Sequence, residues 1–384
     1  DSVVEEVAQA IEPERSPRVV PLRKTVRTAY LLVNRESVRE DAETWRLALL
    51  TAGSPAAILA ESQVVSQRAL LRLLGRLEAE RFGLTELKRF GTDLAELVLH
   101  PNLRELLGRM KDTELVVVHD ADTSRVPWET LHFGSRSPAI DKGMSRRYAA
   151  SDLSLARFSQ QRREQRELAV LLIGNPTDDL PGAELERERI EGLLRGRDGI
   201  RLEVIAGRAA SRARVLGEFQ SGRFDVVHYA GHAFFDPASP GRSGLVCSDG
   251  DLAGEDLESL ARLPSLVVAN ACESGRVRLR AGQQRRGSGQ RATAALAGRV
   301  GLAEALLRGG VANFIGTYWP VGDSAALAFA EVFYARLLAN EALGAAVLAA
   351  RRRVRDLRSP DWADYIHYGD PDFRLKLDTE RDLP

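Results

Sequence analysis

Two stretches of this 384-residue chain decide the fold: FDVVHYAGHA at residues 224–233 and SLVVANACESG at residues 265–275. Each begins with an almost wholly apolar run of strand length and ends in small and polar residues. Strands without a polar alternation are typical of parallel sheets that helices cover on both faces. Both stretches are therefore predicted to form central strands of an α/β fold.

The sequence around these stretches continues the same pattern from residue 168 onward. The expected strands are 168–173, 201–205, 224–229, 265–270 and 311–318. The expected helices are 183–194, 212–219, 254–260, 301–307, 325–338 and 343–357. Such an alternation of strands and helices favours βαβ units, in which a mostly parallel sheet is sandwiched by helices.

The first part of the chain has a different pattern. Residues 1–26 are charged and carry three prolines, which predicts a tail or linker. Residues 28–33 and 114–118 have the composition of short strands, and residues 43–110 between them follow a helical spacing of leucines. We therefore expect an α-rich α/β section at 27–165, followed by the main α/β domain at 166–384.

Composition and charge exclude several classes of protein. Lys+Arg and Asp+Glu are both 54, so no net charge draws the chain toward nucleic acid or a membrane. No apolar run approaches the roughly 18 residues that span a bilayer, and no signal peptide is visible. A cytoplasmic protein without a membrane partner is the simplest interpretation. The chain starts at Asp1 without an initiator methionine, which is compatible with a fragment or processed piece of a longer protein.

Common cofactor and catalytic motifs are missing from the sequence. It contains no GxxxxGK[ST], no strand-linked GxGxxG, no HExxH and no GxSxG. Nucleotide binding, zinc proteolysis and the α/β-hydrolase mechanism are therefore disfavoured, and we expect neither a cofactor nor a metal.

The two cysteines, Cys247 and Cys272, cannot build a disulfide framework or a cysteine-rich zinc site. Cys247 lies in GLVCSDG, which has the pattern of one arm of a hairpin, and it is expected to be a core residue. Cys272 instead follows the second apolar strand directly. Each cysteine therefore needs its own explanation.

The ends of the two quoted strands carry the candidate chemistry. In an open parallel sheet, ligand sites lie beyond the carboxyl ends of the strands, so His232 and Cys272 would emerge at one edge if their strands are neighbours. A thiolate could then attack a carbonyl while the imidazole moves a proton to the leaving group. The backbone N–H groups of Gly231 and Cys272 could stabilise an oxyanion, because glycine lacks a Cβ and allows close approach.

Structural explanations for these residues stay open beside the catalytic one. A cysteine at a strand end is more often a small buried apolar residue than a nucleophile, and a single histidine is more often structural. His228 lies inside its strand and is expected to be a core or supporting group.

At these residues the chain resembles a known family. AGHAFFD, SGLVCSDGDLAGEDL and VVANACESG are similar to the CHAT domain of the caspase-like cysteine peptidases, a clan that also contains separase. Further segments follow in the order of the family: VVVHDADTSRVPWETL, GNPTDDLPGAELERERI, GLAEALLRGGVANFIGTYWPVGDSAALAFAEVFYARLL and YGDPDFRL. The resemblance covers roughly residues 85–376. It implies a caspase-like fold for residues 166–384, a regulatory or pseudo-peptidase role for 27–165, and a catalytic dyad of His232 and Cys272, although Glu273 stands where Gln or Arg is more usual.

The resemblance also implies a specificity pocket. In separase-like members, an Asp after the Trp of a strand-end motif receives a basic side chain, and TYWPVGD places Trp319 and Asp323 there. A carboxylate that faces a guanidinium forms a charge-assisted, often bidentate pair. The alternative is that Asp323 caps a helix that begins near Ser324, and the two roles are compatible. Asp249 and Asp236 are weaker candidates for the pocket.

Residues 276–299 (RVRLRAGQQRRGSGQRATAALAGR) are predicted to form a long exposed loop. The loop follows the candidate nucleophile, at the place where caspase-like enzymes are often cleaved during maturation. It contains no aromatic residue to stack bases, so direct binding of nucleic acid is disfavoured. The candidate self-cleavage positions are Arg276, Arg285, Arg286 and Arg291.

The sequence therefore predicts a cysteine endopeptidase that cleaves proteins after Arg or Lys. The resemblance implies bacterial defence or regulated cell death, an upstream sensor or activator, and a proprotein or pore-forming protein as substrate. The alternative is a sensor or scaffold module that acts by partner binding, with the section at 43–110 as its interaction surface.

Overall fold

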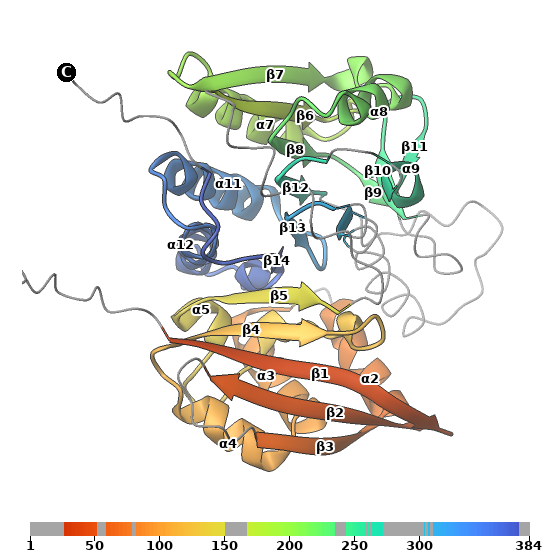
Figure 1. Ribbon diagram of the computed structural model, residues 1–384, viewed down its shortest axis with the longest axis vertical. Helices are drawn as coiled ribbons and strands as arrows, with labels where there is room; N and C mark the ends of the chain where they lie inside the picture. Colours follow the sequence, from red (N-terminus) through yellow and green to blue (C-terminus); the bar gives the residue numbers. More distant parts are fainter. Residues whose placement is uncertain are drawn as a thin grey trace, which may run out of the picture.

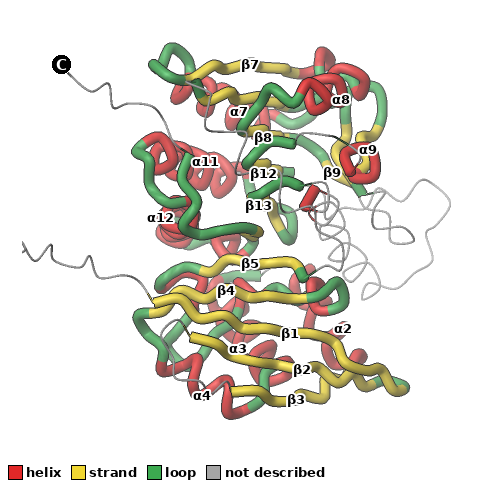
Figure 2. The backbone as a smooth tube through the Cα atoms, in the orientation of Figure 1, coloured by secondary structure: helices red, strands yellow, loops and turns green. Residues whose placement is uncertain are grey.

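The molecule is built on one sheet of eleven strands, in the order β3-β2-β1-β4-β5-β14-β13-β12-β8-β6-β7 (Figure 1). The structure is a computed structural model that describes residues 27–51, 59–78, 82–149, 167–234, 243–258, 260, 263–271, 303, 306–307 and 310–375. Figure 2 shows the strands following one another from β7 at the top of the view to β3 at the bottom. The strands are β1 (Arg27–Arg39), β2 (Ala42–Thr51), β3 (Leu59–Ser66), β4 (Thr113–His119), β5 (Met144–Tyr148), β6 (Leu168–Gly174), β7 (Ile200–Ala206), β8 (Val226–Ala230), β12 (Leu266–Asn270), β13 (Asn313–Thr317) and β14 (Tyr365–Tyr368).

Helices flank this sheet, and most described strand pairs are parallel. Within the described part of this sheet, antiparallel pairing is confined to β1–β2, β2–β3 and β13–β14. The helices are α2 (Gln67–Leu74), α3 (Leu84–Val98), α4 (Pro101–Arg109), α5 (Pro138–Asp141), α7 (Pro181–Leu194), α8 (Arg212–Ser221), α9 (Gly254–Glu258), α11 (Asp323–Leu338) and α12 (Leu343–Asp356). The predicted α/β class, with a mostly parallel sheet between helices, is confirmed.

The N-terminal section differs from its predicted helical character. Residues 42–51 and 59–66 form β2 and β3, so the helical prediction for 43–110 is wrong over its first third and holds from α2 to α4. The apolar side chains of β2 alternate, with Trp45, Leu47 and Leu49 buried on one face. That period of two belongs to a strand with one face on the core, and antiparallel pairing with β1 stabilises it. The short strand β5 was not predicted.

The C-terminal part agrees closely with the sequence pattern. The predicted strands correspond to β6, β7, β8, β12 and β13, and the helices predicted within 183–260 and 325–357 correspond to α7, α8, α9, α11 and α12. The predicted helix at 301–307 lies mostly outside the described residues. A separate small sheet of β9 (Ala233–Phe234), β10 (Gly244–Val246) and β11 (Asp251–Ala253) contains the predicted hairpin. Cys247 follows β10 and is 3% exposed, which confirms its core position.

The two parts share one sheet through β14. This strand pairs antiparallel with β13 and parallel with β5, so the sheet is continuous across the boundary expected at residues 165–166, which itself lies outside the described residues. Arg351 of α12 strengthens the junction, because its guanidinium donates to the carbonyls of Met144 in β5 at 2.9 Å and Tyr365 in β14 at 2.6 Å. The N-terminal section therefore packs as part of the body that holds the strand ends.

Candidate functional site at the strand ends

The candidate site forms where β6, β8 and β12 end side by side. These strands are parallel, with Gly174 opposite Ala230 and Ala230 opposite Asn270. The condition set by the sequence analysis, that the two quoted strands are neighbours, is therefore met. His232 comes two residues after Ala230, just as Cys272 comes two residues after Asn270.

Several predicted residues lie outside the described part of the chain. Cys272 and Glu273 lie there, as do the predicted self-cleavage positions Arg276, Arg285, Arg286 and Arg291 and the weaker pocket candidate Asp236. Their roles stay predictions.

His232 has a carboxylate partner that the sequence analysis did not assign. Its Nε2 lies 3.0 Å from Oδ1 of Asp179, in the loop between β6 and α7. The His232 side chain is 13% exposed and that of Asp179 is 45% exposed, so the pair sits at the surface end of the sheet. A carboxylate at one ring nitrogen holds the imidazole in one orientation and favours one tautomer.

Asn175 shapes the loop that carries Asp179. Its backbone N–H donates to the carbonyl of Ala230 at 2.8 Å, which ties the loop to the end of β8. Its side-chain Oδ1 accepts from the N–H groups of Asp179 at 3.2 Å and Leu180 at 3.0 Å. Asn175 adopts a left-handed conformation with φ 46°, which asparagine tolerates better than most residues. The loop is thus built to present Asp179 beside His232.

Tyr229 holds the backbone of His232 through hydrogen bonding to its carbonyl. Its hydroxyl lies 2.6 Å from the carbonyl oxygen of His232 and 2.8 Å from that of Val246, and it donates toward both. The His232 carbonyl also accepts from the N–H of Val246 at 3.0 Å. Burial raises the pKa of Tyr229 well above its usual value, so the hydroxyl keeps its proton and remains a donor.

Gly231 is glycine because of close packing. A Cβ at this position would lie 2.7 Å from the Tyr229 hydroxyl and 2.9 Å from Cδ of Pro176, closer than atoms of a side chain can approach. Its backbone N–H, predicted as an oxyanion donor, donates to the carbonyl of Asn270 at 3.3 Å. The oxyanion role therefore requires exchange of this long bond when a substrate binds, and it stays a prediction.

Trp319 lies just beyond the end of β13, and several groups hold it. Its indole Nε1–H donates to Oδ1 of Asp361 at 3.3 Å, and its backbone N–H donates to the side chain of Asp364. Its ring contacts Phe82 of the N-terminal section in an edge-to-face arrangement, with ring centroids 6.4 Å apart. The N-terminal section thus reaches a predicted pocket residue directly.

Asp323 is the first residue of α11, whose N-cap is Gly322. The expectation that Asp323 caps a helix beginning near Ser324 is therefore wrong by one position. Its exposed carboxylate lies against Gly182 in the first turn of α7, where a Cβ would come within 2.3 Å of it. Asp323 therefore lies at the first turn of both α11 and α7. Gly182, which it contacts in α7, follows Asp179 by three residues in the sequence.

Asp249, a weaker pocket candidate, accepts from the N–H of Arg212 at 2.6 Å, which gives it a structural role at the start of α8.

The environment of Cys247 makes its thiol unreactive. Burial, with Asp249 and Asp251 nearby, raises the pKa of Cys247 to about 12, so this thiol stays protonated and unreactive at neutral pH.

Within the ranges that the structure describes, no three His, Cys, Asp or Glu side chains converge as a metal site. In the same ranges, every helix is too short or too polar to cross a bilayer.

Comparison with known proteins identifies the family. The chain belongs to the CHAT domain family, whose model matches residues 88–370, which confirms the resemblance found in the sequence. A comparison with curated proteins finds no match.

Among solved structures, the chain is similar to separase and to RgpB. Two structures of the Saccharomyces cerevisiae separase–securin complex have TM-scores of 0.44 and 0.43 and 16% identity, over 84% of this chain and 21% of that chain. The complex of the pro- and mature domains of Porphyromonas gingivalis RgpB has a TM-score of 0.49 and 12% identity, over 75% of this chain and 72% of that chain. The chain thus spans about a fifth of the length of the separase chain.

Asp179 is the residue that sequence reasoning missed at the site. The stretch GNPTDDLPG contained the signal, since paired aspartates directly follow a buried strand that ends beside the strand of His232. That neighbourhood becomes visible only when the strand order β12-β8-β6 is known.

Proposed function

We propose that this chain is a cysteine endopeptidase whose catalytic dyad is His232 and Cys272. The observation that carries the proposal is the parallel register of β8 and β12, in which Ala230 lies opposite Asn270. His232 and Cys272 each follow these residues by two positions. The carboxylate of Asp179, 3.0 Å from Nε2 of His232, supports it by orienting the imidazole.

The proposed reaction proceeds in two stages. The Cys272 thiolate attacks the scissile carbonyl carbon, so a C–S bond forms and the carbonyl oxygen becomes an oxyanion. His232 then gives a proton to the leaving amine as the C–N bond breaks. Water hydrolyses the resulting thioester, which releases the carboxylic acid product and returns the thiol.

The proposed specificity is for Arg or Lys before the cleaved bond. The exposed carboxylate of Asp323 would pair with the basic side chain, and Trp319 would form a wall of the same pocket. The support is the position of both residues after the end of β13, on the same sheet edge as His232.

The proposed biological setting follows from the family resemblance. We place the enzyme in bacterial defence or regulated cell death in the cytoplasm, with a proprotein or pore-forming protein as substrate. An upstream partner, or self-cleavage within residues 276–299, would activate it. The section at 27–165 would transmit such activation, because it shares the sheet with the catalytic part.

The decisive experiment compares wild type with Cys272→Ala. Newly formed protein termini are identified across a bacterial proteome, together with cleavage of a panel of Arg- and Lys-containing peptides. Wild type should create termini after Arg or Lys, whereas Cys272→Ala and His232→Ala should create none. Equal patterns for wild type and Cys272→Ala would refute the peptidase and favour the partner-binding alternative.

A further inference from the structure

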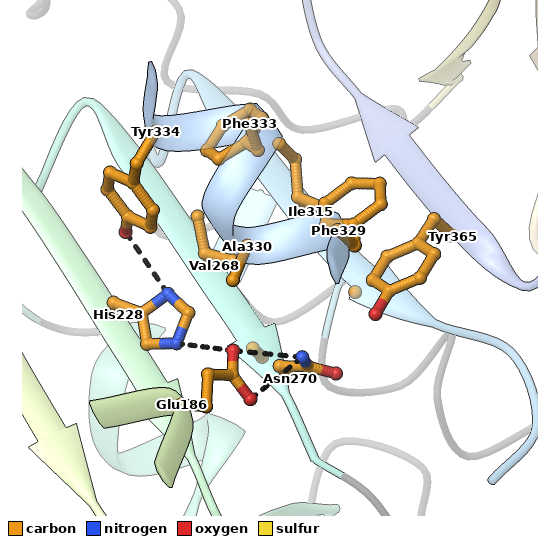
Figure 3. A pocket seen from close by; sticks show the side chains of 12 residues that line it. Glu186, His228, Val268, Asn270, Ile315, Phe329, Ala330, Phe333, Tyr334 and Tyr365 are labelled. Atoms are coloured by element: carbon orange, nitrogen blue, oxygen red, sulfur yellow. Dashed lines mark hydrogen bonds and ion pairs between the residues drawn. The ribbon is translucent and has the colours of Figure 1, made fainter. Parts of the chain in front are cut away.

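A buried polar cluster lies directly beneath the two strand ends (Figure 3). It consists of Glu186, His228, Asn270 and Tyr334, which are each at most 3% exposed. The side-chain amide of Asn270 donates to both carboxylate oxygens of Glu186, at 2.9 and 3.0 Å. His228 lies between the other two groups, with Nε2 3.1 Å from Oε1 of Glu186 and Nδ1 3.1 Å from the Tyr334 hydroxyl.

The surroundings of this cluster are apolar. The same side chains line a cavity of about 10 Å³ together with Val268, Ile315 and Phe333. Burial, with the Glu186 carboxylate nearby, raises the pKa of Tyr334, so its hydroxyl keeps its proton beside His228. The cluster is therefore a connected set of polar groups inside the hydrophobic core.

Stability alone does not account for such an arrangement. Removing a carboxylate and an imidazole from water is costly, and replacing a buried pair by apolar side chains of similar volume is often neutral or stabilising. A connected buried network does, however, favour one relative placement of the elements that carry it, because a shift would break contacts between its polar groups.

Each of the four cluster residues belongs to an element that leads to a site residue. Glu186 is in α7, which directly follows the loop of Asp179, and Tyr334 is in α11, which begins at Asp323. His228 is in β8, four residues before His232, and Asn270 ends β12, two residues before Cys272. In addition, the backbone carbonyl of Asn270 accepts from the N–H of Gly231, which joins the two strand ends.

We propose that Glu186, His228, Asn270 and Tyr334 act as positioning residues that hold the Cys272, His232, Asp179 and Asp323 segments in their catalytic arrangement. This inference rests on the proposed peptidase function. None of the four groups contacts substrate, so each acts through the element that carries it. Small displacements of catalytic groups cost up to about 100-fold in rate, which makes such a device measurable.

The test uses Glu186→Gln and Tyr334→Phe in the full chain. Glu186→Gln keeps the shape but turns one acceptor into a donor that faces the donors of Asn270 and His228, whereas Tyr334→Phe removes only the hydroxyl. Glu188→Gln is the matched control, since Glu188 is on the same helix with a side chain that is 60% exposed. Hydrolysis of an Arg-aminomethylcoumarin peptide gives kcat and KM, and thermal unfolding gives Tm.

A second readout does not depend on peptidase activity. Iodoacetamide alkylation of Cys272 is followed by mass spectrometry of its peptide, with Cys247 in the same molecule as a reporter of unfolding. Cys247 is 3% exposed with a pKa of about 12, so it reacts only when the fold opens. A change confined to Cys272 reports altered positioning rather than lost structure.

We expect kcat to fall about 10- to 100-fold in both variants, with KM within about twofold and Cys247 still protected. Cys272 alkylation should also change, and Glu188→Gln should behave as wild type. Unchanged kcat and unchanged Cys272 alkylation, or losses matched by Cys247 exposure, would overturn the positioning role. If wild type does not hydrolyse the peptide but Cys272 alkylation responds to both variants, the positioning role stands and the peptidase proposal falls.

Discussion

His232 is held through both its side chain and its backbone. Asp179 faces its Nε2 at 3.0 Å, while the Tyr229 hydroxyl and the Val246 N–H meet its carbonyl at 2.6 and 3.0 Å. Successive residues of β8 point to opposite faces of the sheet, so Tyr229 supports the His232 carbonyl from one face while His228 faces Glu186 and Tyr334 on the other. This double support leaves His232 little freedom, which is what a proton-transfer group needs.

Replacement of Asp179 tests the importance of its contact with His232. We expect Asp179→Ala to lower kcat on an Arg peptide about 10- to 100-fold, because the imidazole loses the group that fixes its orientation and tautomer. Tm should change little, since the Asp179 side chain is 45% exposed. Asp178→Asn is the control, because Asp178 is adjacent and left-handed at φ 60°, a conformation that asparagine accepts. Equal activity of the two variants would contradict an orienting role for Asp179.

At the scale of elements, the apolar strands were predictable, whereas β2 and β3 were not. The runs at 168–173 and 265–270 are buried on both faces, so their composition alone identifies them. β2, with the sequence AETWRLALLT, is rich in Ala and Leu, which favour helices. Pairing with β1 and β3 overrides that preference, and such non-local partners cannot be seen in a local pattern.

The candidate site residues also divide into those that a local sequence pattern indicates and those that depend on the fold. His232 and Cys272 were proposed from the sequence because each comes soon after an apolar strand, and the structure confirms that these two strands are neighbours. Asp179 was not, because its position depends on the left-handed Asn175 and on the strand order. Glu186 was hidden for another reason: a glutamate in a charged helix is usually on the surface, whereas here it is 2% exposed.

Glu114 in β4 gives the molecule a pH-dependent stability. Burial, with Asp372 and Asp370 nearby, raises its pKa from 4.5 to about 7, against the opposing effect of Arg351. Between these pH values the folded chain holds a proton that the unfolded chain has lost, so this contribution to stability is full below pH 4.5 and is lost as the pH rises to about 7.

We therefore expect Glu114→Gln to stabilise the protein at pH 8 and to have little effect near pH 4.5. The gain in the free energy of unfolding should be on the order of 2 kcal/mol, which is less than the full pKa shift of Glu114 implies because the carboxylate is partly exposed. Urea unfolding of wild type and variant at both pH values measures it. Glu105→Gln, with a side chain that is 63% exposed, should show no such pH dependence. A gain of equal size at both pH values would exclude titration of Glu114 as its cause.

At the scale of the whole molecule, the N-terminal section is joined to the C-terminal part at several buried points. Glu129 accepts from Nε of Arg146 at 2.9 Å, and Arg351 of α12 lies 3.8 Å from the same carboxylate. The Tyr318 hydroxyl, one residue before Trp319, donates to the carbonyl of Arg125. A displacement of the N-terminal section would therefore also move the end of β13. An activating partner that binds the N-terminal section could act on the proposed site through this connection.

Phe82 is the most direct test of that route. Its ring packs edge-to-face on both Trp319, at 6.4 Å, and Phe90, at 5.9 Å, so it ties the predicted pocket wall to α3. We expect Phe82→Ala to raise KM for an Arg peptide several-fold with a smaller change in kcat, because Trp319 loses a packing partner worth about 0.5–1.5 kcal/mol while His232 and Asp179 are untouched.

Phe133→Ala serves as the matched control for Phe82→Ala. Phe133 is also a partly buried aromatic residue of the N-terminal section, but it packs near Gly108. Both variants should lower Tm by a few degrees, so stability alone would not distinguish them. The ratio of KM between the two variants measures the coupling. If Phe133→Ala raised KM as much as Phe82→Ala, the effect would come from general loosening of the N-terminal section rather than from the contact of Phe82 with Trp319.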